Sequence, residues 1–239
     1  MKRFILNSVK PPKKERLNEK IIFQIKNLIL NKNFEIGQRL PSEREMAKNL
    51  KVSRSVIRET IRSLEQAGLI EVKPGAKGGA FITEKYHLPL YRSVYDLLHN
   101  KRINLYHLLE ARKVIECSIV KMVIKSVKKE DIQDLESINQ KMVNTYQDGE
   151  KIRKINADFH IKLAEISGNP LLKLITQAIF EIINQLLPDS TRTPHFIRYA
   201  YEKHKAIIEA IKKKDLKLCE QTISKDIDHM KRLKGFKLK

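Results

Sequence analysis

The sequence predicts a mainly α-helical protein in two parts, an N-terminal winged helix-turn-helix followed by a C-terminal all-helical bundle. Glycine and proline interrupt the chain at short intervals before residue 90 and are widely spaced after it. In the first part, two short helical segments follow each other closely and lead into a segment with β-type alternation. In the second part, apolar residues recur at three- and four-residue spacing without such alternation. This pattern is typical of a small mixed domain joined to a helical one.

The same observations place the domain boundaries. We expect an N-terminal tail 1–14, a winged helix-turn-helix 15–85, a linker 86–91, a helical domain 92–233 and a C-terminal tail 234–239.

The composition is compatible with a DNA-binding protein of the cytoplasm. The formal net charge of +20 favours a polyanionic partner, although a general lysine bias produces the same excess. Cys117 and Cys219 lie far apart and form no Cys-x-x-Cys motif, so we expect both to be reduced. No stretch is apolar enough for a membrane span, and the apolar run at the N-terminus is too short for a signal peptide. We therefore expect no membrane partner.

The first part has the signals of a helix-turn-helix. Apolar side chains at helical spacing predict a helix over residues 15–30. Ser42 begins a capping box and opens a second, short helix. Ser53 is the N-cap of a third helix, which ends at Gly68. Because only residues 51–52 separate the second helix from its successor, the two helices must cross steeply.

A wing follows directly. Residues 69–83, LIEVKPGAKGGAFIT, alternate on either side of a Pro/Gly/Lys turn and predict a β-hairpin. Lys77 adds positive charge at its tip. Gly78 and Gly79 either let the backbone approach DNA closely or simply satisfy the turn, and both interpretations stay open.

The third helix carries a basic face. Apolar residues occupy one side, and the opposite side presents Arg54, Ser55, Arg58 and Arg62. Near the N-terminus of a helix in the major groove, arginines reach guanine edges and serines donate to phosphates. Arg44, on the preceding helix, is expected at the groove margin. A solvated charged face is the alternative, and the position of this face between a helix-turn-helix and a wing favours DNA binding.

The run RLPSEREMAKNLKVSRSVIRETIRSLEQAGLIEVKPG is very similar to the N-terminal domain of the GntR family of bacterial regulators. This resemblance covers about residues 15–85 and implies a homodimer on a palindromic, double-stranded operator. The wing is longer than the usual Gly-x-Gly-x-x-Val tip of the family. The resemblance also implies DNA contacts by Arg44, Ser53, Arg54, Ser55, Arg58 and a wing glycine, Gly78 or Gly79.

The second part is predicted to contain seven helices, at 92–99, 103–126, 129–146, 150–167, 170–187, 195–213 and 215–233. Within them, Asn156 and His160 share one helical face, and His204 and Asp226 lie on the last two helices. Two imidazoles and two oxygen donors suit a divalent cation. A histidine on an apolar helix is more often a core residue, and spacing alone does not bring these four side chains together.

The stretches DFHIKLAEISGNPLL and HKAIIEAIKKKD look like the FadR C-terminal (FCD) ligand-binding domain, over about residues 92–233. This resemblance implies a small carboxylate effector that a divalent metal, commonly zinc or nickel, helps to fix, although some members of the family bind their effector without a metal. By position the ligands are Asn156, His160, His204 and Asp226, where the family usually has Asp, His, His and His; His229 is a substitute for the last. The resemblance also implies that Arg112 binds the carboxylate of the effector. The alternative is that Arg112 forms a surface ion pair with Glu116, four residues further on.

The leading hypothesis is therefore a transcription regulator, and most commonly a repressor in this family, controlled by a small carboxylate or sugar acid. Two other classes stay open: a metal-dependent enzyme using His160 and His204, and an architectural protein indifferent to DNA sequence. We expect no enzyme, because the chain has no catalytic triad order, phosphate loop or zincin motif.

Overall fold

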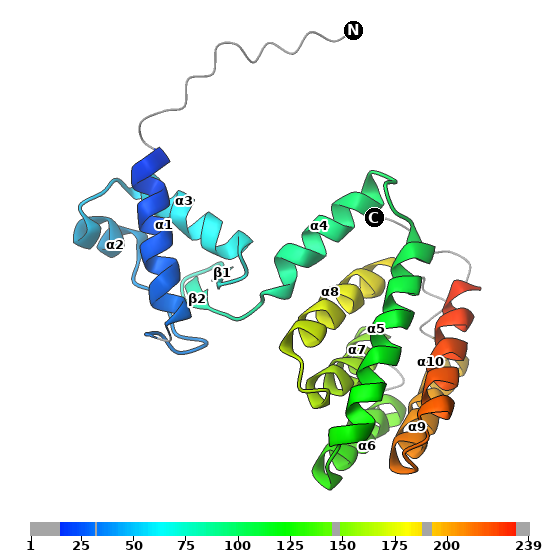
Figure 1. The fold of residues 1–239 in the computed structure, drawn as a ribbon. Coiled ribbons are helices and arrows are strands. Elements are labelled where there is room, and N and C mark those ends of the chain that lie inside the picture. Colours follow the sequence, from blue (N-terminus) through cyan, green and yellow to red (C-terminus); the bar gives the residue numbers. More distant parts are fainter. Residues whose placement is uncertain (1–14, 32, 145–148, 188–192, 233–239) are drawn as a thin grey trace, which may run out of the picture. The chain divides into compact units, whose positions relative to one another are not determined.

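The computed structural model describes residues 15–31, 33–144, 149–187 and 193–232, and the predicted tails lie outside these ranges. The chain divides into two compact units, Met1–Pro89 and Leu90–Lys239 (Figure 1). The first holds a helix-turn-helix with a two-stranded wing, and the second is a helical bundle, which confirms the predicted fold class.

The first unit consists of α1 (Glu15–Leu30), α2 (Glu43–Leu50), α3 (Arg54–Gln66), β1 (Ile70–Lys73) and β2 (Gly79–Ile82). β1 and β2 pair antiparallel, with Ile70 opposite Ile82 and Lys73 opposite Gly79. The hairpin packs with α1 and α3 around a core of Ile29, Leu40, Leu64, Leu69, Ile70, Ala80 and Ile82.

Caps define the short helices of this unit. The Ser42 hydroxyl accepts a hydrogen bond from the backbone N–H of Glu45, whose carboxylate accepts one from Ser42 N at 2.8 Å, so the predicted capping box is present. Ser53 caps α3 as predicted. Gly68 ends it with φ at 73°, and a Cβ there would lie 2.2 Å from the backbone oxygen of Lys85. Only glycine fits at this position.

The helices of the second part are α4 (His87–His99), α5 (Leu105–Ser126), α6 (Lys129–Asn144), α7 (Gly149–Ile166), α8 (Pro170–Leu186), α9 (Pro194–Lys212) and α10 (Leu216–Lys231). Their bounds closely follow the prediction except at α4. It begins at His87 rather than at residue 92, so most of the expected linker 86–91 is helical. Pro89 is compatible with this, because the first turn of a helix uses no backbone N–H donors.

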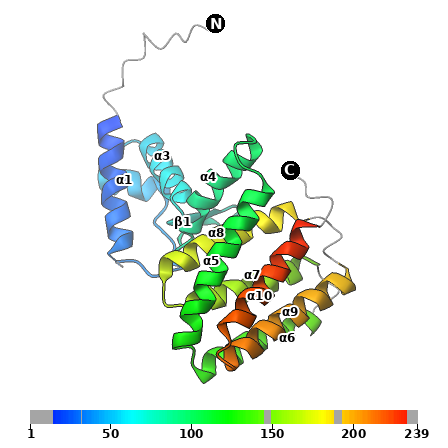
Figure 2. The same ribbon diagram turned by 45° about the vertical axis from the view of Figure 1, so that its right-hand side comes forward.

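α5 packs against α7, α8 and α10, and α9 packs against α6 and α10 (Figure 2). Fully buried apolar side chains, among them Leu109, Val123 and Phe159, fill the space between these helices. Among the polar side chains buried in the same interior are Arg112, Glu116, Asn139, His160 and His204. Buried polar groups are costly unless they form hydrogen bonds or ion pairs. The contacts among these side chains define the second site described below.

No helix in the described part of the chain is long and apolar enough to cross a membrane. Cys117 and Cys219 are both unpaired.

Candidate functional site

The exposed face of α3 is basic. Ile57 and Leu64 are buried beneath the helix, whereas the side chains of Arg54 and Arg58 are 61% and 57% exposed. Arg62 continues this face one turn further and is also exposed. The apolar stripe of α3 therefore faces inward and leaves three arginines in solvent at four-residue spacing.

A glutamate that the sequence analysis did not single out holds two of these arginines. Arg58 Nε donates a 2.9 Å hydrogen bond to Glu43 Oε2, and Arg54 lies 3.8 Å from the same oxygen. Glu43 is the first residue of α2, so it joins the two helices of the helix-turn-helix on their solvent side. The sequence feature that could have pointed to Glu43 is its position directly after the N-cap Ser42.

The other predicted DNA-contacting side chains are also exposed: Arg44, Ser53, Ser55 and Lys77. The Ser53 and Ser55 hydroxyls lie 2.7 Å apart at the start of α3. Gly78 is buried, and a Cβ on it would lie 2.2 Å from the backbone oxygen of Lys73. The turn therefore gives a sufficient reason for glycine at this position.

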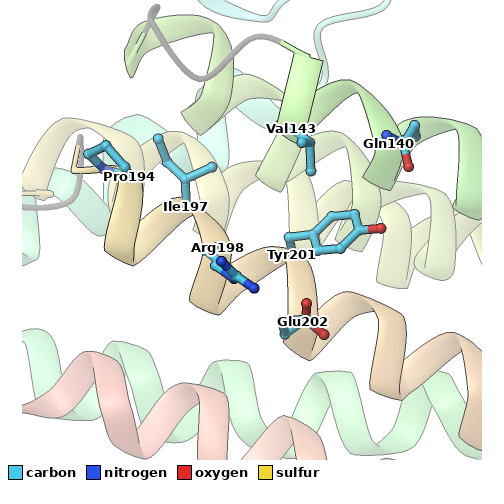
Figure 3. Close-up of a pocket in the computed structure, with 7 residues that line it drawn as sticks. All are labelled: Gln140, Val143, Pro194, Ile197, Arg198, Tyr201 and Glu202. Atoms are coloured by element: carbon cyan, nitrogen blue, oxygen red, sulfur yellow. The ribbon is translucent and has the colours of Figure 1, made fainter.

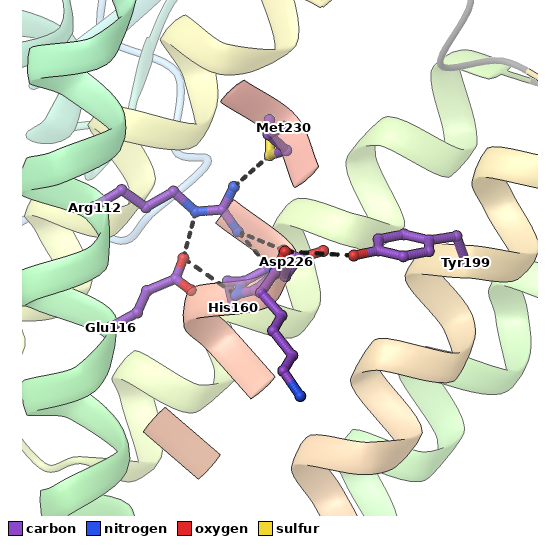
Figure 4. Close-up of polar contacts among 7 residues, drawn as sticks. Arg112, Glu116, His160, Tyr199, Asp226 and Met230 are labelled. Atoms are coloured by element: carbon purple, nitrogen blue, oxygen red, sulfur yellow. Dashed lines mark hydrogen bonds and ion pairs between the residues drawn. The ribbon is translucent and has the colours of Figure 1, made fainter. Parts of the chain in front are cut away.

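A second site lies in the interior of the bundle and is centred on Arg112 of α5 (Figure 4). The Arg112 side chain is 1% exposed, and its Nε donates a 2.6 Å hydrogen bond to Oε1 of Glu116, one turn along the helix. The predicted alternative of a surface pair is wrong in its location, because this ion pair is buried. Burial alone would raise the pKa of Glu116, but the charges of Arg112 and His160 outweigh it and lower this pKa to about 2.

Three further groups surround the guanidinium. Its terminal nitrogens lie 2.8 Å from the sulfur of Met230, 3.3 Å from His160 Nε2 and 3.5 Å from Asp226 Oδ2. A thioether is a weak acceptor, and a separation of 3.5 Å is at the limit of a hydrogen bond. The far edge of Arg112 is therefore held much more weakly than its Nε.

Two buried polar atoms beside Arg112 have no hydrogen-bond partner among the described residues. They are Glu116 Oε2 and His160 Nδ1. His160 Nδ1 does lie 3.2 Å from Glu116 Oε1, which is close enough for electrostatic attraction but lacks hydrogen-bond geometry. Unsatisfied polar atoms are costly in a protein interior, and a polar ligand or water would satisfy these two.

His204 of α9 adjoins this cluster. Its ring stacks on Phe159 at 3.8 Å and meets the His160 ring edge-on at 5.1 Å. Its Nδ1 lies 3.2 Å from Asn139 Oδ1, and the Asn139 amide donates in turn to the backbone oxygen of Tyr201. Burial, and then the nearby charges of His160 and Arg112, lower the pKa of His204 well below its ordinary value.

The residues of the predicted metal site do not fit a metal in this arrangement. A guanidinium only donates hydrogen bonds, so Asp226 Oδ2 directs a lone pair at Arg112, and His160 Nε2 faces the same terminal nitrogen at 3.3 Å. Asn156 is half-buried on α7, and among the described residues no hydrogen bond joins it to the other three. His229 instead stacks on Tyr199 at 4.1 Å. Within the described ranges, no three His, Cys, Asp or Glu side chains are grouped to hold a metal ion.

A surface pocket of about 360 Å³ lies between α6 and α9 (Figure 3). Arg198, Tyr201 and Glu202 line it from α9, and Gln140 and Val143 from α6. It contains none of the predicted site residues. A hydrogen bond from Asn139 to the backbone oxygen of Tyr201 links its wall to the buried cluster.

Comparison with known protein families assigns both units. The description "Bacterial regulatory proteins, gntR family" matches residues 17–82, and "FCD domain" matches residues 107–229, about half of the chain. The chain belongs to the GntR family of transcription regulators with an FCD domain. The domain matches fall on the helix-turn-helix with its wing and on the bundle, respectively.

Relatives of this GntR/FCD regulator have similar length and organisation. The HTH-type transcriptional regulator LutR of Bacillus subtilis is 26% identical over 77% of this chain and 85% of its own. The HTH-type transcriptional repressor NanR of Cronobacter sakazakii is 26% identical over 86% and 80%. Among solved structures, the Streptococcus agalactiae GntR protein is 27% identical, with a TM-score of 0.61 over 90% of this chain and all of its own. These relatives are regulators, which confirms that the chain is not an enzyme.

Proposed function

We propose that this regulator is a repressor that binds a palindromic operator as a homodimer, in the cytoplasm, and that a small hydroxycarboxylate or sugar acid bound at Arg112 controls its operator affinity. The relative NanR is named a transcriptional repressor, which supports repression rather than activation. No metal is part of this proposal. The zinc or nickel site implied for Asn156, His160, His204 and Asp226 is left out, because no three His, Cys, Asp or Glu side chains within the described ranges are grouped to hold a metal ion.

The observation that carries the DNA-binding half is the arginine face of α3. Arg54 and Arg58 are exposed, lie one turn apart and are pre-oriented by Glu43. A planar guanidinium matches the two acceptors of guanine in the major groove, and this contact reads sequence. Arg44, Ser53 and Ser55 surround these two arginines with donors for phosphates. The proposed roles of Lys77, Gly78 and Gly79 are contacts from the wing.

The test is a comparison of single variants on a selected operator. An operator is first obtained by in vitro selection with the full-length protein, and binding is followed by fluorescence anisotropy. Arg54→Ala and Arg58→Ala should each cost about 1–3 kcal/mol, roughly 5- to 150-fold in affinity, and relax the preference for one base pair. The control Lys121→Ala removes the same charge from an exposed position on α5 and should change affinity little. Equal affinity of the wild type for operator and random DNA would instead favour an architectural protein.

The proposal of an effector site rests on the polar groups around Arg112 whose hydrogen-bonding capacity is not fully used. The outer edge of its guanidinium is held only by Met230 and, at longer distance, by His160 and Asp226. A carboxylate bonds two parallel N–H groups of such an edge and is a far better acceptor than a thioether. Glu116 Oε2 has no hydrogen-bond partner among the described residues. We propose that it accepts a hydrogen bond from a hydroxyl of the ligand. A ligand that carries both a carboxylate and a hydroxyl group is a hydroxy acid or a sugar acid.

This site offers a simple link to a conformational change. Asp226 and Met230 both lie on α10, and both contact the edge of Arg112 that a ligand carboxylate would take. Binding of the effector therefore competes with two contacts that join α10 to α5. A ligand shifts a two-state equilibrium only through contacts that differ between the states, and these two contacts supply the difference.

A thermal-shift screen tests the effector half. Lactate, gluconate, glucuronate and citrate are added to the full-length protein with and without a chelator. We expect at least one acid to raise the melting temperature, and Arg112→Lys to abolish this shift because a lysine has no bidentate fork. The same acid should weaken operator binding. If no acid of this class shifts the melting temperature of the wild type, the proposed site is wrong, and an acid that strengthens operator binding would exclude a repressor released by its effector.

A further inference from the structure

We infer that the Arg112 guanidinium takes the place of the divalent metal in this FCD domain, so that the cation of the effector site is supplied by the chain itself. The inference deepens the proposed function, since it concerns the same effector site. It contradicts the metal site that the resemblance implied.

The geometry of the two closest predicted ligands carries the first step. His160 Nε2 is 3.3 Å and Asp226 Oδ2 is 3.5 Å from the same terminal nitrogen of Arg112. A metal held by these atoms would lie about 2.0–2.2 Å from each. The guanidinium occupies the space between both donors and α5, so a metal and Arg112 cannot share them without strong charge repulsion.

The anchoring of Arg112 carries the second step. Its Nε donates a 2.6 Å hydrogen bond to Glu116, and its Cζ lies over the Phe180 ring, 4.5 Å from the ring centroid. Phe180 also stacks on His160 at 4.7 Å. A cation fixed by an ion pair on one edge and an aromatic face below is part of the packed interior.

The charged side chains around Arg112 are consistent with its guanidinium as the cation of the site. Arg112 and Glu116 are both almost fully buried and offset each other, and Asp226, whose side chain is 14% exposed, is the only other acid in contact with the guanidinium among the described residues. The two departures from the family pattern point the same way. Asn156 lacks the charge of the usual Asp, so it offers a metal a weaker ligand. Asp226, which replaces a histidine, is a natural partner for a guanidinium.

The direct test is metal content. Full-length protein is incubated with ZnCl₂ or NiCl₂, desalted and assayed by inductively coupled plasma mass spectrometry. We expect the wild type to retain far less than one metal per chain, and neither metal nor chelator to change its melting temperature. Retention of near-stoichiometric zinc or nickel, or a fall in melting temperature with chelator, would overturn the inference.

Variants test whether Arg112 itself excludes the metal. Arg112→Met alone leaves Glu116 as an uncompensated buried charge, so the charge-balanced pair Arg112→Met/Glu116→Gln is used beside it. We expect the folded double variant to gain zinc, and His160→Ala in the same background to remove the gain. Arg112→Lys, which keeps the positive charge, should stay metal-free. A double variant that folds but takes up no zinc contradicts the inference.

These measurements involve neither DNA nor an acid effector. A metal-containing wild type would overturn the role of Arg112 as the resident cation and leave operator binding and effector response to their own tests.

Discussion

Individual residues determine how each site is arranged, and Glu43 is the least expected of them. It lies within 3.8 Å of both Arg54 and Arg58, although its own side chain is 33% exposed. A carboxylate so close to the proposed DNA-reading face repels phosphate and at the same time fixes the two guanidinium groups. We therefore assign it a role in specificity rather than in affinity, because it restrains the arginines before any base is contacted.

The variant Glu43→Gln tests this role. We expect the affinity for random DNA to rise, and the ratio of operator to random-DNA affinity to fall by about five-fold, equivalent to about 1 kcal/mol. The effect on stability should be less than about 1 kcal/mol, since all three side chains are solvated. Anisotropy titrations on both DNAs at two salt concentrations measure the ratio. Glu35→Gln makes the same charge change outside α2 and α3, and an identical result for the two variants would rule out a specific role for Glu43.

The contacts of Arg112 were only partly predictable from the sequence. Its helical position and the pairing with Glu116 were readable from four-residue spacing. Its burial, and its contacts with Met230 and His160, depend on how α5, α7 and α10 pack. Contacts between residues far apart in the sequence leave no local pattern, so a single sequence does not contain them in readable form.

At the scale of elements, prediction succeeded where the signal is local. The capping box at Ser42, the N-cap at Ser53 and the αL glycine at Gly68 each involve neighbours within a few residues, and each is present in the structure. The start of α4 was not predicted, because a proline such as Pro89 is also typical of a break between helices. A proline is equally compatible with the first turn of a helix, and sequence alone does not distinguish the two positions.

The short helix α2 depends on its cap more than the longer helices do. It has eight residues, so its intrinsic stability is low and the capping box satisfies a large share of its end groups. Ser42→Ala should cost about 1 kcal/mol in the free energy of unfolding and weaken operator binding, because Glu43 and Arg44 lie in the first turn. Urea denaturation followed by circular dichroism measures the stability. Ser63→Ala, in the interior of α3, should be nearly neutral, and equal costs at both serines would argue against the cap as the cause.

At the scale of the whole molecule, the buried polar cluster makes the stability of the fold depend on pH. The pKa of His204 is lowered well below 6.5, chiefly by burial, so the native state keeps this ring unprotonated where the unfolded chain protonates it. The unfolded state then binds more protons below pH 6.5, and stability must fall as the pH falls. Glu116 acts in the same direction only below about pH 4.5, because its native pKa is about 2. The two contributions are thus separated on the pH scale.

Between pH 6.5 and 5.5, the His204 contribution should reduce the free energy of unfolding by about 1 kcal/mol, the cost of one proton taken up preferentially by the unfolded chain. Urea denaturation of the full-length protein at pH 7.5, 6.5 and 5.5 measures this slope. His204→Gln should lower stability at every pH but flatten the slope, whereas the exposed His99→Gln should preserve it. If His204→Gln retains the wild-type slope, the ring is not held unprotonated in the bundle. A flattened slope would instead establish that the interior around Arg112 carries its fixed positive charge without a second cation on His204.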